Sequence, residues 1–482
     1  MSKLSQLEPQ SVFYYFEKIA GIPHGSGNTK AISDYCVEFA KEHNLRYIQD
    51  ESNNVIIFKE ASAGYEDAKP VVLQGHLDMV CVKDADADID MEKDGLDLQI
   101  DGDYVYAKGT TLGGDDGIAV AYCLAVLADN TLAHPPIEAV FTTDEEIGLL
   151  GAADLDASVL QGRKLINLDS EEEGIFLTSC AGGLTATCSL PVRYREQTGL
   201  VYELKIKGLL GGHSGIEIHK ERLNANKLMG RLLYTVGDEM EFSLAALNGG
   251  VKDNAIPSSA RATLVIEEGE AEHLESVVTR LEKIVQHEYK SSDPDLEIEI
   301  KKIGTDTKKV LNLKNQECVV FFLMHAPNGV IRWSMDIEGL VQTSLNLGIM
   351  ELTGECCKFS FAVRSSVETE KIFLAQKLQY LIEFLGGVYE ESGDYPGWEF
   401  RKESPLRDMM VRTYEDLFGK KPAVEAVHAG LECGVFIGKI PDMDCISLGP
   451  DMLHVHSPQE KLSISSTKRM WDFLVEVLKN CR

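Results

Sequence analysis

The stretch PVVLQGHLDMV at 70–80 is an apolar run that ends in polar side chains, a pattern typical of a buried β-strand. Three further runs of the same kind occur: PIEAVFTTD at 136–144, KLINLDS at 164–170 and MDCISLG at 443–449. An apolar helical segment, GIAVAYCLAVLADN at 117–130, lies between the first two of these strands. Alternation of strands and helices predicts an α/β domain built on a mostly parallel sheet.

The middle of the chain, 187–398, has a different pattern and predicts a separate α+β domain. It contains two similar segments, 260–286 and 357–386, each an alternating strand followed by a helix with apolar residues at helical spacing. We interpret this similarity as an internal duplication. The expected organisation is an α/β domain in two parts, 1–186 and 399–482, with the duplicated domain inserted between them.

Composition excludes several classes of protein. The chain has 482 residues, which predicts more than one domain, and a formal net charge of −30, which disfavours nucleic acid as a partner. No apolar run approaches the roughly 20 residues that a membrane span requires. The first ten residues, MSKLSQLEPQ, lack the apolar core of a secretory signal. Eleven cysteines without a CxxC pair are typical of reduced thiols, so we expect a cytoplasmic protein.

Acidic and imidazole side chains gather at the ends of the predicted strands and before the first helix. They are His76, Asp78, Asp115, Glu145, Glu146, Asp169 and His456. Functional groups in open parallel sheets lie beyond the carboxyl ends of the strands, so these distant segments are expected to meet. Imidazole and carboxylate are ligands that zinc accepts, and a carboxylate can bridge two cations about 3.5–4 Å apart. The pattern predicts two divalent metal ions, zinc foremost, with cobalt or manganese as alternatives.

Several ordered motifs resemble one family over nearly the whole chain. They are HxD after a strand, GTTLGGDDGIA, TTDEEIGLLGA, LLGGHSG, HAGLECGVF and HSPQE. These are similar to the two-zinc exopeptidases that include glutamate carboxypeptidase and peptidase T, and especially to the carnosinase-like aminoacyl-histidine (Xaa-His) dipeptidases. The resemblance implies a two-metal catalytic domain, an inserted lid domain that binds substrate, and metal-dependent hydrolysis of unblocked dipeptides, with Xaa-His as the expected type.

The resemblance also implies the metal ligands. Asp115 would bridge both ions, with His76 and Asp169 completing one site and Glu146 and His456 completing the other. The peptide between Asp115 and Asp116 would be cis. Spacing alone leaves one alternative at the last ligand, since His454 lies two residues before His456.

Two further acidic residues receive roles from the same resemblance. Asp78 would accept a hydrogen bond from His76 and fix its tautomer. Glu145 would be the general base that acts on a metal-bridging water. The division of roles between Glu145 and Glu146 comes from the resemblance, because their spacing does not separate them, and Asp144 stays an alternative.

The middle domain would contribute to substrate binding. In the family, a histidine like His213 stabilises the oxyanion from the lid, and residues like Asn254 and Arg364 bind the substrate carboxylate. Arginine suits that task through its bidentate fork. Glu432 is the candidate for the substrate amine. Because the middle domain is duplicated, we expect His213 to complete the site of its own chain, whether the protein is a monomer or a homodimer.

Two other functions are compatible with the same residues. One is an N-acyl amino acid amidohydrolase (deacetylase) on the same fold, which would differ only in its lid contacts. The other is a non-catalytic metal-binding scaffold. The presence of Glu145 argues against the scaffold, because a protein without catalysis has little need for a base that binds no metal.

Overall fold

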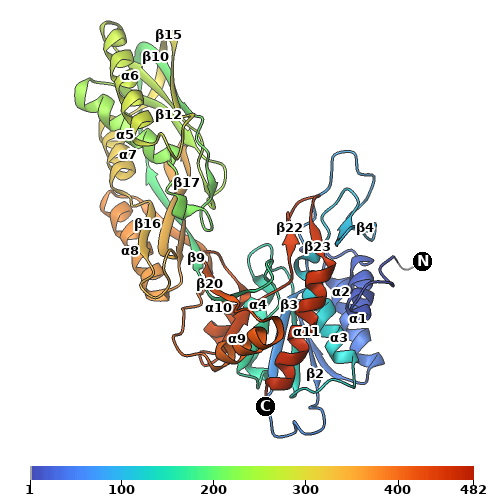
Figure 1. Ribbon diagram of the computed structural model, residues 1–482. Coiled ribbons are helices and arrows are strands. Elements are labelled where there is room, and N and C mark those ends of the chain that lie inside the picture. The colour runs from blue at the N-terminus through green and yellow to red at the C-terminus, as the bar shows by residue number, and fades with distance from the viewer. Residues whose placement is uncertain (1–2) are drawn as a thin grey trace. The chain divides into compact units, whose positions relative to one another are not determined.

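The computed structural model describes residues 3–482 and divides the chain into two compact units (Figure 1). Unit 1 consists of the chain up to Cys180, Trp398–Ala426 and Leu431–Arg482, and unit 2 consists of Ala181–Gly397 and Val427–Gly430. The short segment Val427–Gly430 joins unit 2 because the N–H of Ala181 donates a hydrogen bond to the carbonyl of Ala429 at 3.0 Å.

Unit 1 is built on an eight-stranded sheet in the order β1-β2-β6-β3-β7-β21-β8-β20. The strands are β1 (Arg46–Gln49), β2 (Val55–Lys59), β3 (Val71–His76), β6 (Ile137–Thr142), β7 (Lys164–Asn167), β8 (Ile175–Cys180), β20 (Ala423–Val427) and β21 (Asp444–Ser447). The four central strands β6, β3, β7 and β21 are parallel, while β2 and β8 add antiparallel neighbours on either side. The predicted α/β fold with a mostly parallel sheet is therefore confirmed.

Helices cover both faces of this sheet. They are α1 (Gln10–Ala20), α2 (Lys30–Glu42), α3 (Gly114–Ala128), α4 (Leu150–Asp154), α9 (Pro405–Phe418), α10 (Glu432–Lys439) and α11 (Ile464–Asn480). Strand β3 is buried at every position, as expected for a strand between two covered faces. Helix α3 is buried almost throughout because it is apolar on all sides, and it packs in one core with α1 and α11. Its first turn is thereby fixed at the edge of the sheet.

A small four-stranded sheet in unit 1 carries the last predicted ligand segment. Its order is β22-β23-β5-β4, with β4 (Leu98–Asp101), β5 (Tyr104–Ala107), β22 (Met452–Leu453) and β23 (Lys461–Ser463). The antiparallel pair β22–β23 closes the loop that contains His456. Pairing of β23 with β5 ties this loop to an earlier part of the chain.

Unit 2 contains one nine-stranded antiparallel sheet, in which eight strands form two equivalent halves and β16 pairs with β17. The strands are β9 (Gly182–Pro191), β10 (Tyr194–Lys207), β12 (Ser243–Gly249), β14 (Ala260–Ile266), β15 (Glu297–Leu311), β16 (Gly329–Trp333), β17 (Val341–Leu352), β18 (Cys356–Ser365) and β19 (Val388–Tyr395). The helices are α5 (Ala225–Glu239), α6 (Ala271–Glu288), α7 (Leu313–His325) and α8 (Glu368–Phe384). Side chains from all four helices form one core with the sheet (Figure 1).

The two halves have the same topology. In one, β10, α5, β12, β14, α6 and β15 give the strand order β15-β10-β14-β12. In the other, β9, α7, β17, β18, α8 and β19 give the order β19-β9-β18-β17, and the halves meet where β12 pairs with β17. The segments 260–286 and 357–386 correspond to β14–α6 and β18–α8, which occupy equivalent places. The predicted internal duplication is therefore confirmed.

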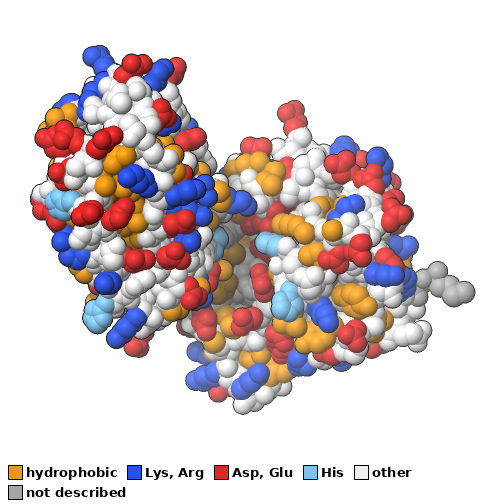
Figure 2. Space-filling view, turned by 90° about the horizontal axis from the view of Figure 1, so that it is seen from above, with side chains coloured by type: hydrophobic (Ala, Val, Ile, Leu, Met, Phe, Trp, Pro, Cys, Tyr) orange, Lys and Arg blue, Asp and Glu red, His pale blue; other side chains and the backbone are white. Residues whose placement is uncertain are grey.

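On the face shown in Figure 2, acidic side chains are scattered over both units among basic and hydrophobic ones, and the net charge of the chain is −30. Within residues 3–482, no helix has the length and apolar content needed to cross a membrane.

Candidate active site

The sheet of unit 1 brings four ligand-bearing segments to one edge. His76 is the last residue of β3, Asp169 follows β7, and Glu145 and Glu146 follow β6. Because β6, β3 and β7 are adjacent and parallel, their carboxyl ends lie together, where polar groups of an open sheet gather. Asp115 arrives at the same edge in the first turn of α3.

Asp115 lies between two histidines. Its Oδ1 is 3.0 Å from Nε2 of His76, and its Oδ2 is 3.0 Å from Nε2 of His456. Glu146 Oε1 lies 2.8 Å from the same nitrogen of His456, and Asp169 Oδ1 lies 3.6 Å from that of His76. Each carboxylate oxygen of Asp115 thus faces a different imidazole, which is the arrangement that a bridging carboxylate needs. The peptide between Asp115 and Asp116 is cis, as expected.

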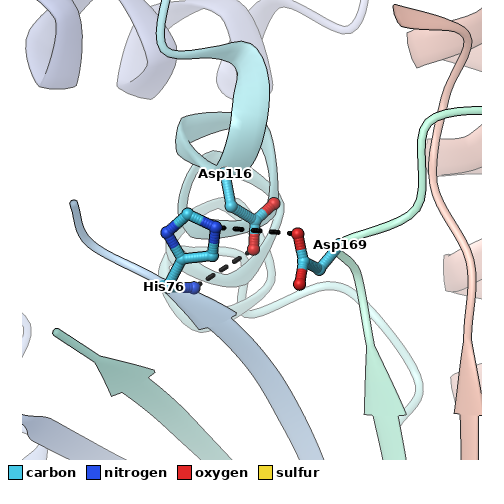
Figure 3. A group of neighbouring side chains, drawn as sticks. All are labelled: His76, Asp116 and Asp169. Atoms are coloured by element: carbon cyan, nitrogen blue, oxygen red, sulfur yellow. Dashed lines mark hydrogen bonds and ion pairs between the residues drawn. The ribbon is translucent and has the colours of Figure 1, made fainter. Parts of the chain in front are cut away.

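Figure 3 shows His76, Asp116 and Asp169 at this edge, from β3, α3 and the segment after β7. Asp116 is fully buried, and its Oδ2 accepts a hydrogen bond from the main-chain N–H of His76 at 3.1 Å. Burial, followed by the charge of Asp169, raises the pKa of Asp116 well above its usual range. Sequence reasoning did not assign a role to Asp116. Asp116 is the second aspartate of GGDDG, and the sequence does not distinguish it from a solvent-exposed residue.

Three groups of side chains in this cluster have the composition of metal sites. They are His76, Asp116 and Asp169; His76, Glu145 and Glu146; and Asp115, Glu146 and His456, with the ligand atoms of each group within 4.8 Å of one another. Hydrogen bonds to Asp115 and Glu146 raise the pKa of His456 to about 11. So many carboxylates converge here that positive charge is needed to balance them, which divalent cations supply. The donor set therefore fits two such ions.

Asp78 supports both His76 and the turn that carries the two glutamates. Its carboxylate accepts hydrogen bonds from Ser26 Oγ at 2.8 Å and from the main-chain N–H of Glu145 at 3.0 Å. His76 Nδ1 lies 2.9 Å from the main-chain oxygen of Asp78 and 3.4 Å from its carboxylate. The nearer acceptor for the imidazole is therefore the backbone, whereas the sequence had suggested the carboxylate.

The alternatives that spacing left open differ in their surroundings. The carboxylate of Asp144 accepts a hydrogen bond from the main-chain N–H of Gly27 at 2.6 Å and belongs to none of the three groups. His454 is exposed and also belongs to none of them, while His456 contacts two carboxylates. Glu145 is half-buried, and burial raises the pKa of its carboxyl well above the usual range.

Glu432 lies beneath the strand ends. It is fully buried, and its Oε2 accepts hydrogen bonds from Thr142 Oγ1 at 2.7 Å and from the side chain of Gln74. Burial raises the pKa of this carboxyl to about 7. This differs from the predicted contact with a substrate amine, which requires an accessible carboxylate. The motif HAGLECG gave no sign that its glutamate begins the buried first turn of α10.

Unit 2 assembles a separate polar cluster. Strand β11 (Gly212–His213) pairs with β13 (Ala255–Ile256), so the segments of His213 and Asn254 are neighbours. His213 Nδ1 accepts hydrogen bonds from the main-chain N–H groups of Gly215 and Ile216 at 3.1 and 3.2 Å, which leaves Nε2 to carry the proton. Burial, followed by the charge of Arg364, lowers the pKa of His213.

Arg364 and His428 complete this cluster. Arg364 is buried in β18 and donates to the hydroxyl of Tyr395 at 2.9 Å, while its Nε has no partner within residues 3–482. His428 Nε2 lies 2.7 Å from Ser344 Oγ, and burial together with Arg364 lowers the pKa of His428 to about 3. Sequence reasoning missed His428, which shares the HAGLECG motif with Glu432. Hydrogen-bond donors around a buried arginine are suited to binding a carboxylate.

Comparison with known proteins gives independent evidence about this site. Residues 72–480 match Peptidase family M20/M25/M40. The chain is 40% identical over 481 residues, 99% of each sequence, to the cytosol non-specific dipeptidase of Escherichia coli strain K12. It also resembles the crystal structure of the aminoacylhistidine dipeptidase from Vibrio alginolyticus, with a TM-score of 0.92 and 38% identity over 99% of this chain and 98% of that one. Aminopeptidase PepT from Bacillus cereus shares the fold, with a TM-score of 0.56 and 13% identity over 98% and 99% of the two chains.

Proposed function

The chain belongs to peptidase family M20/M25/M40 and is a hydrolase of peptide bonds, and from this premise we propose that it is a two-metal dipeptidase that cleaves unblocked dipeptides, including Xaa-His. Two observations support the proposal. The first is the placement of Asp115 between His76 and His456, 3.0 Å from each. The second is the similarity over 99% of the chain to two proteins named as dipeptidases.

His76, Asp115 and Asp169 would hold one divalent ion, and Asp115, Glu146 and His456 would hold the other. When bound, the two ions would polarise the scissile carbonyl and lower the pKa of the attacking water. Zinc is the expected metal, because all five ligands are imidazoles or carboxylates. Asp116 would orient His76 through its main-chain N–H.

Glu145 would act as the general base. It would take a proton from the attacking water and pass it to the leaving amine. It is suited to this role because Glu146, and not Glu145, contacts His456, so the second metal site does not require the Glu145 carboxylate. The hydrogen bond from its main-chain N–H to Asp78 fixes the turn from which the side chain projects. General bases of this kind contribute about 10²–10⁴-fold to the rate.

The cluster in unit 2 would bind the substrate. Arg364 and Asn254 would hold the carboxylate of the dipeptide, and His213 would donate from Nε2 to the oxyanion. His428 lies in the same cluster and extends the set beyond the residues that the sequence suggested. We further propose that the protein works in the cytoplasm, as the name of the Escherichia coli relative suggests.

A substrate panel tests the proposed function. Purified protein would be assayed on Xaa-His dipeptides, other dipeptides and N-acetyl amino acids, each with and without a chelator. Cleavage of free dipeptides that stops with chelator and returns with Zn²⁺ is the expected result. Cleavage of N-acetyl amino acids alone would indicate a deacetylase, and no hydrolysis of any substrate at saturating metal would refute a catalytic role.

A further inference from the structure

Glu460 is a buried carboxylate that the mechanism above does not use. Only 2% of the residue is exposed. Its Oε2 accepts from the main-chain N–H of Leu112 at 2.7 Å, and its Oε1 accepts from that of Gly114 at 2.8 Å. Longer contacts of 3.3 and 3.4 Å join it to the N–H groups of Gly113 and Asp115. One side chain therefore receives four successive main-chain donors.

These four N–H groups lie at the start of α3, in a turn that contains no acceptor for them. The first N–H groups of a helix have no acceptor within the helix, and Gly113, at the N-cap of α3, has no side chain to supply one. Asp115 and Asp116 also have non-helical backbone angles, with ψ values of 105° and 31°, so helical hydrogen bonds do not hold this turn. The acceptor comes from a residue 345 positions from Asp115.

Glu460 also closes the loop that carries His456. Its main-chain N–H donates to the carbonyl of Ser457 at 3.0 Å, and the next residue, Lys461, begins β23. The loop of His456 and the turn of Asp115 are thus fastened to each other at Glu460. The Asp115 and His456 side chains, which lie 3.0 Å apart, are carried by the two segments that Glu460 joins.

We propose that Glu460 is a positioning residue. It holds the two carboxylate oxygens of Asp115 and the imidazole of His456 in the relative position that metal binding requires. This inference rests on the proposed function, because it concerns the same metal ligands. Glu460 is in none of the three groups of candidate metal ligands, and it acts through the main chain of both loops. Since Asp115 would serve both ions, loss of Glu460 weakens both sites together.

The test is a Zn²⁺ titration of metal-free protein by calorimetry, together with kcat and KM on a dipeptide. The variant Glu460→Gln keeps the size of the side chain but turns an amide N–H₂ towards main-chain donors. Supporting groups of this kind typically contribute about 10–100-fold to metal affinity. We expect the half-saturating Zn²⁺ concentration to rise by that factor at both sites, and kcat to fall while KM stays at the wild-type value.

Glu138 provides a matched control. It is also a buried carboxylate, 4% exposed, and it accepts hydrogen bonds from the main-chain N–H groups of Gln161 and Gly162 at 3.0 Å. It lies near the start of β6, and both of these donors belong to the segment before β7. Glu138→Gln should lower thermal stability without changing Zn²⁺ affinity. An equal loss of affinity in both variants would overturn the positioning role, as would wild-type affinity at both sites in Glu460→Gln.

A second variant covers the case in which Glu460→Gln does not fold. A Cβ at Gly114 would lie 3.1 Å from Glu460 Oε1 and 3.1 Å from Met452 Sδ. Gly114→Ala therefore displaces the same carboxylate slightly without removing it, and weaker binding at both sites is again expected. Unchanged Zn²⁺ affinity in this variant overturns the inference. Wild-type protein that binds no Zn²⁺ pair and cleaves no dipeptide would instead refute the proposed function.

Discussion

Replacing Asp78 by alanine should separate catalysis from metal binding at the site of His76 and Asp169. The carboxylate is fully buried and accepts two short hydrogen bonds, from Ser26 Oγ at 2.8 Å and from Glu145 N–H at 3.0 Å. Hydrogen bonds to a charged group contribute about 1.5–3 kcal/mol each, so their loss should cost roughly 3–6 kcal/mol of unfolding free energy at most. The imidazole of His76 keeps its nearer acceptor, the main-chain oxygen at 2.9 Å, which the substitution does not remove.

The consequence is a selective loss of activity. The turn carrying Glu145 loses its anchor, so kcat should fall by about 10–100-fold, the usual range for a supporting carboxylate. Zn²⁺ binding at the site of His76 and Asp169 should weaken far less. Calorimetric Zn²⁺ titration, steady-state kinetics and urea unfolding would be measured on the same preparations.

Asp444 offers a matched control for this variant. Its carboxylate also accepts from one serine hydroxyl and one main-chain N–H, those of Ser404 at 2.6 Å and Leu406 at 2.9 Å. It begins β21, at the opposite edge of the parallel strands from the ligand cluster. Asp444→Ala should lose stability without a change in kcat. If Asp78→Ala instead lost Zn²⁺ as severely as His76→Ala, the carboxylate and not the backbone would control the imidazole, and the reasoning would be refuted.

Three further predictions follow from the same geometry. Glu145→Gln should keep both metals and lose about 10²–10⁴-fold in kcat, whereas Glu146→Gln should lose one metal; near-normal kcat in the first variant would exclude Glu145 as the base. Asp115→Ala should lose both metals by elemental analysis, and full occupancy would exclude a bridging role. Mixing inactive Glu145→Gln and His213→Ala proteins under subunit exchange should restore no activity if His213 completes the site of its own chain, and substantial recovery would show that it acts in a partner.

The sequence was sufficient for the parts of the fold that depend on local pattern. Apolar runs located β3, β6, β7 and β21, and the polar residues after them marked the edge at which the segments meet. The duplication was visible because β14–α6 and β18–α8 repeat the same periodicity. Such signals survive in a single sequence because burial of a strand or a helix face constrains each residue type directly.

Hydrogen bonds between residues far apart in the chain could not be predicted from local pattern. Asp144 accepts from Gly27, 117 residues away, and Glu460 accepts from Gly114, 346 residues away. The residues next to Asp144 and Glu460 in the sequence do not indicate which distant N–H group will donate to them. The burial of Glu432 has the same origin, because Gln74 and Thr142 reach it from other strands. Hydrogen bonds between loops depend on tertiary arrangement and leave no periodic trace.

His76 and His213 show that the main chain can determine which role an imidazole takes, although the residue type is the same. His76 Nδ1 lies against a carbonyl, which accepts a hydrogen bond from Nδ1–H, so Nε2 keeps its lone pair for a metal. His213 Nδ1 lies against two N–H groups, which donate, so Nε2 must carry a proton and can only donate when the ring is neutral. The lowered pKa of His213 keeps the ring in that neutral form near pH 7. One imidazole is therefore arranged as a ligand and the other as a hydrogen-bond donor, and the difference lies entirely in the main-chain group that faces Nδ1.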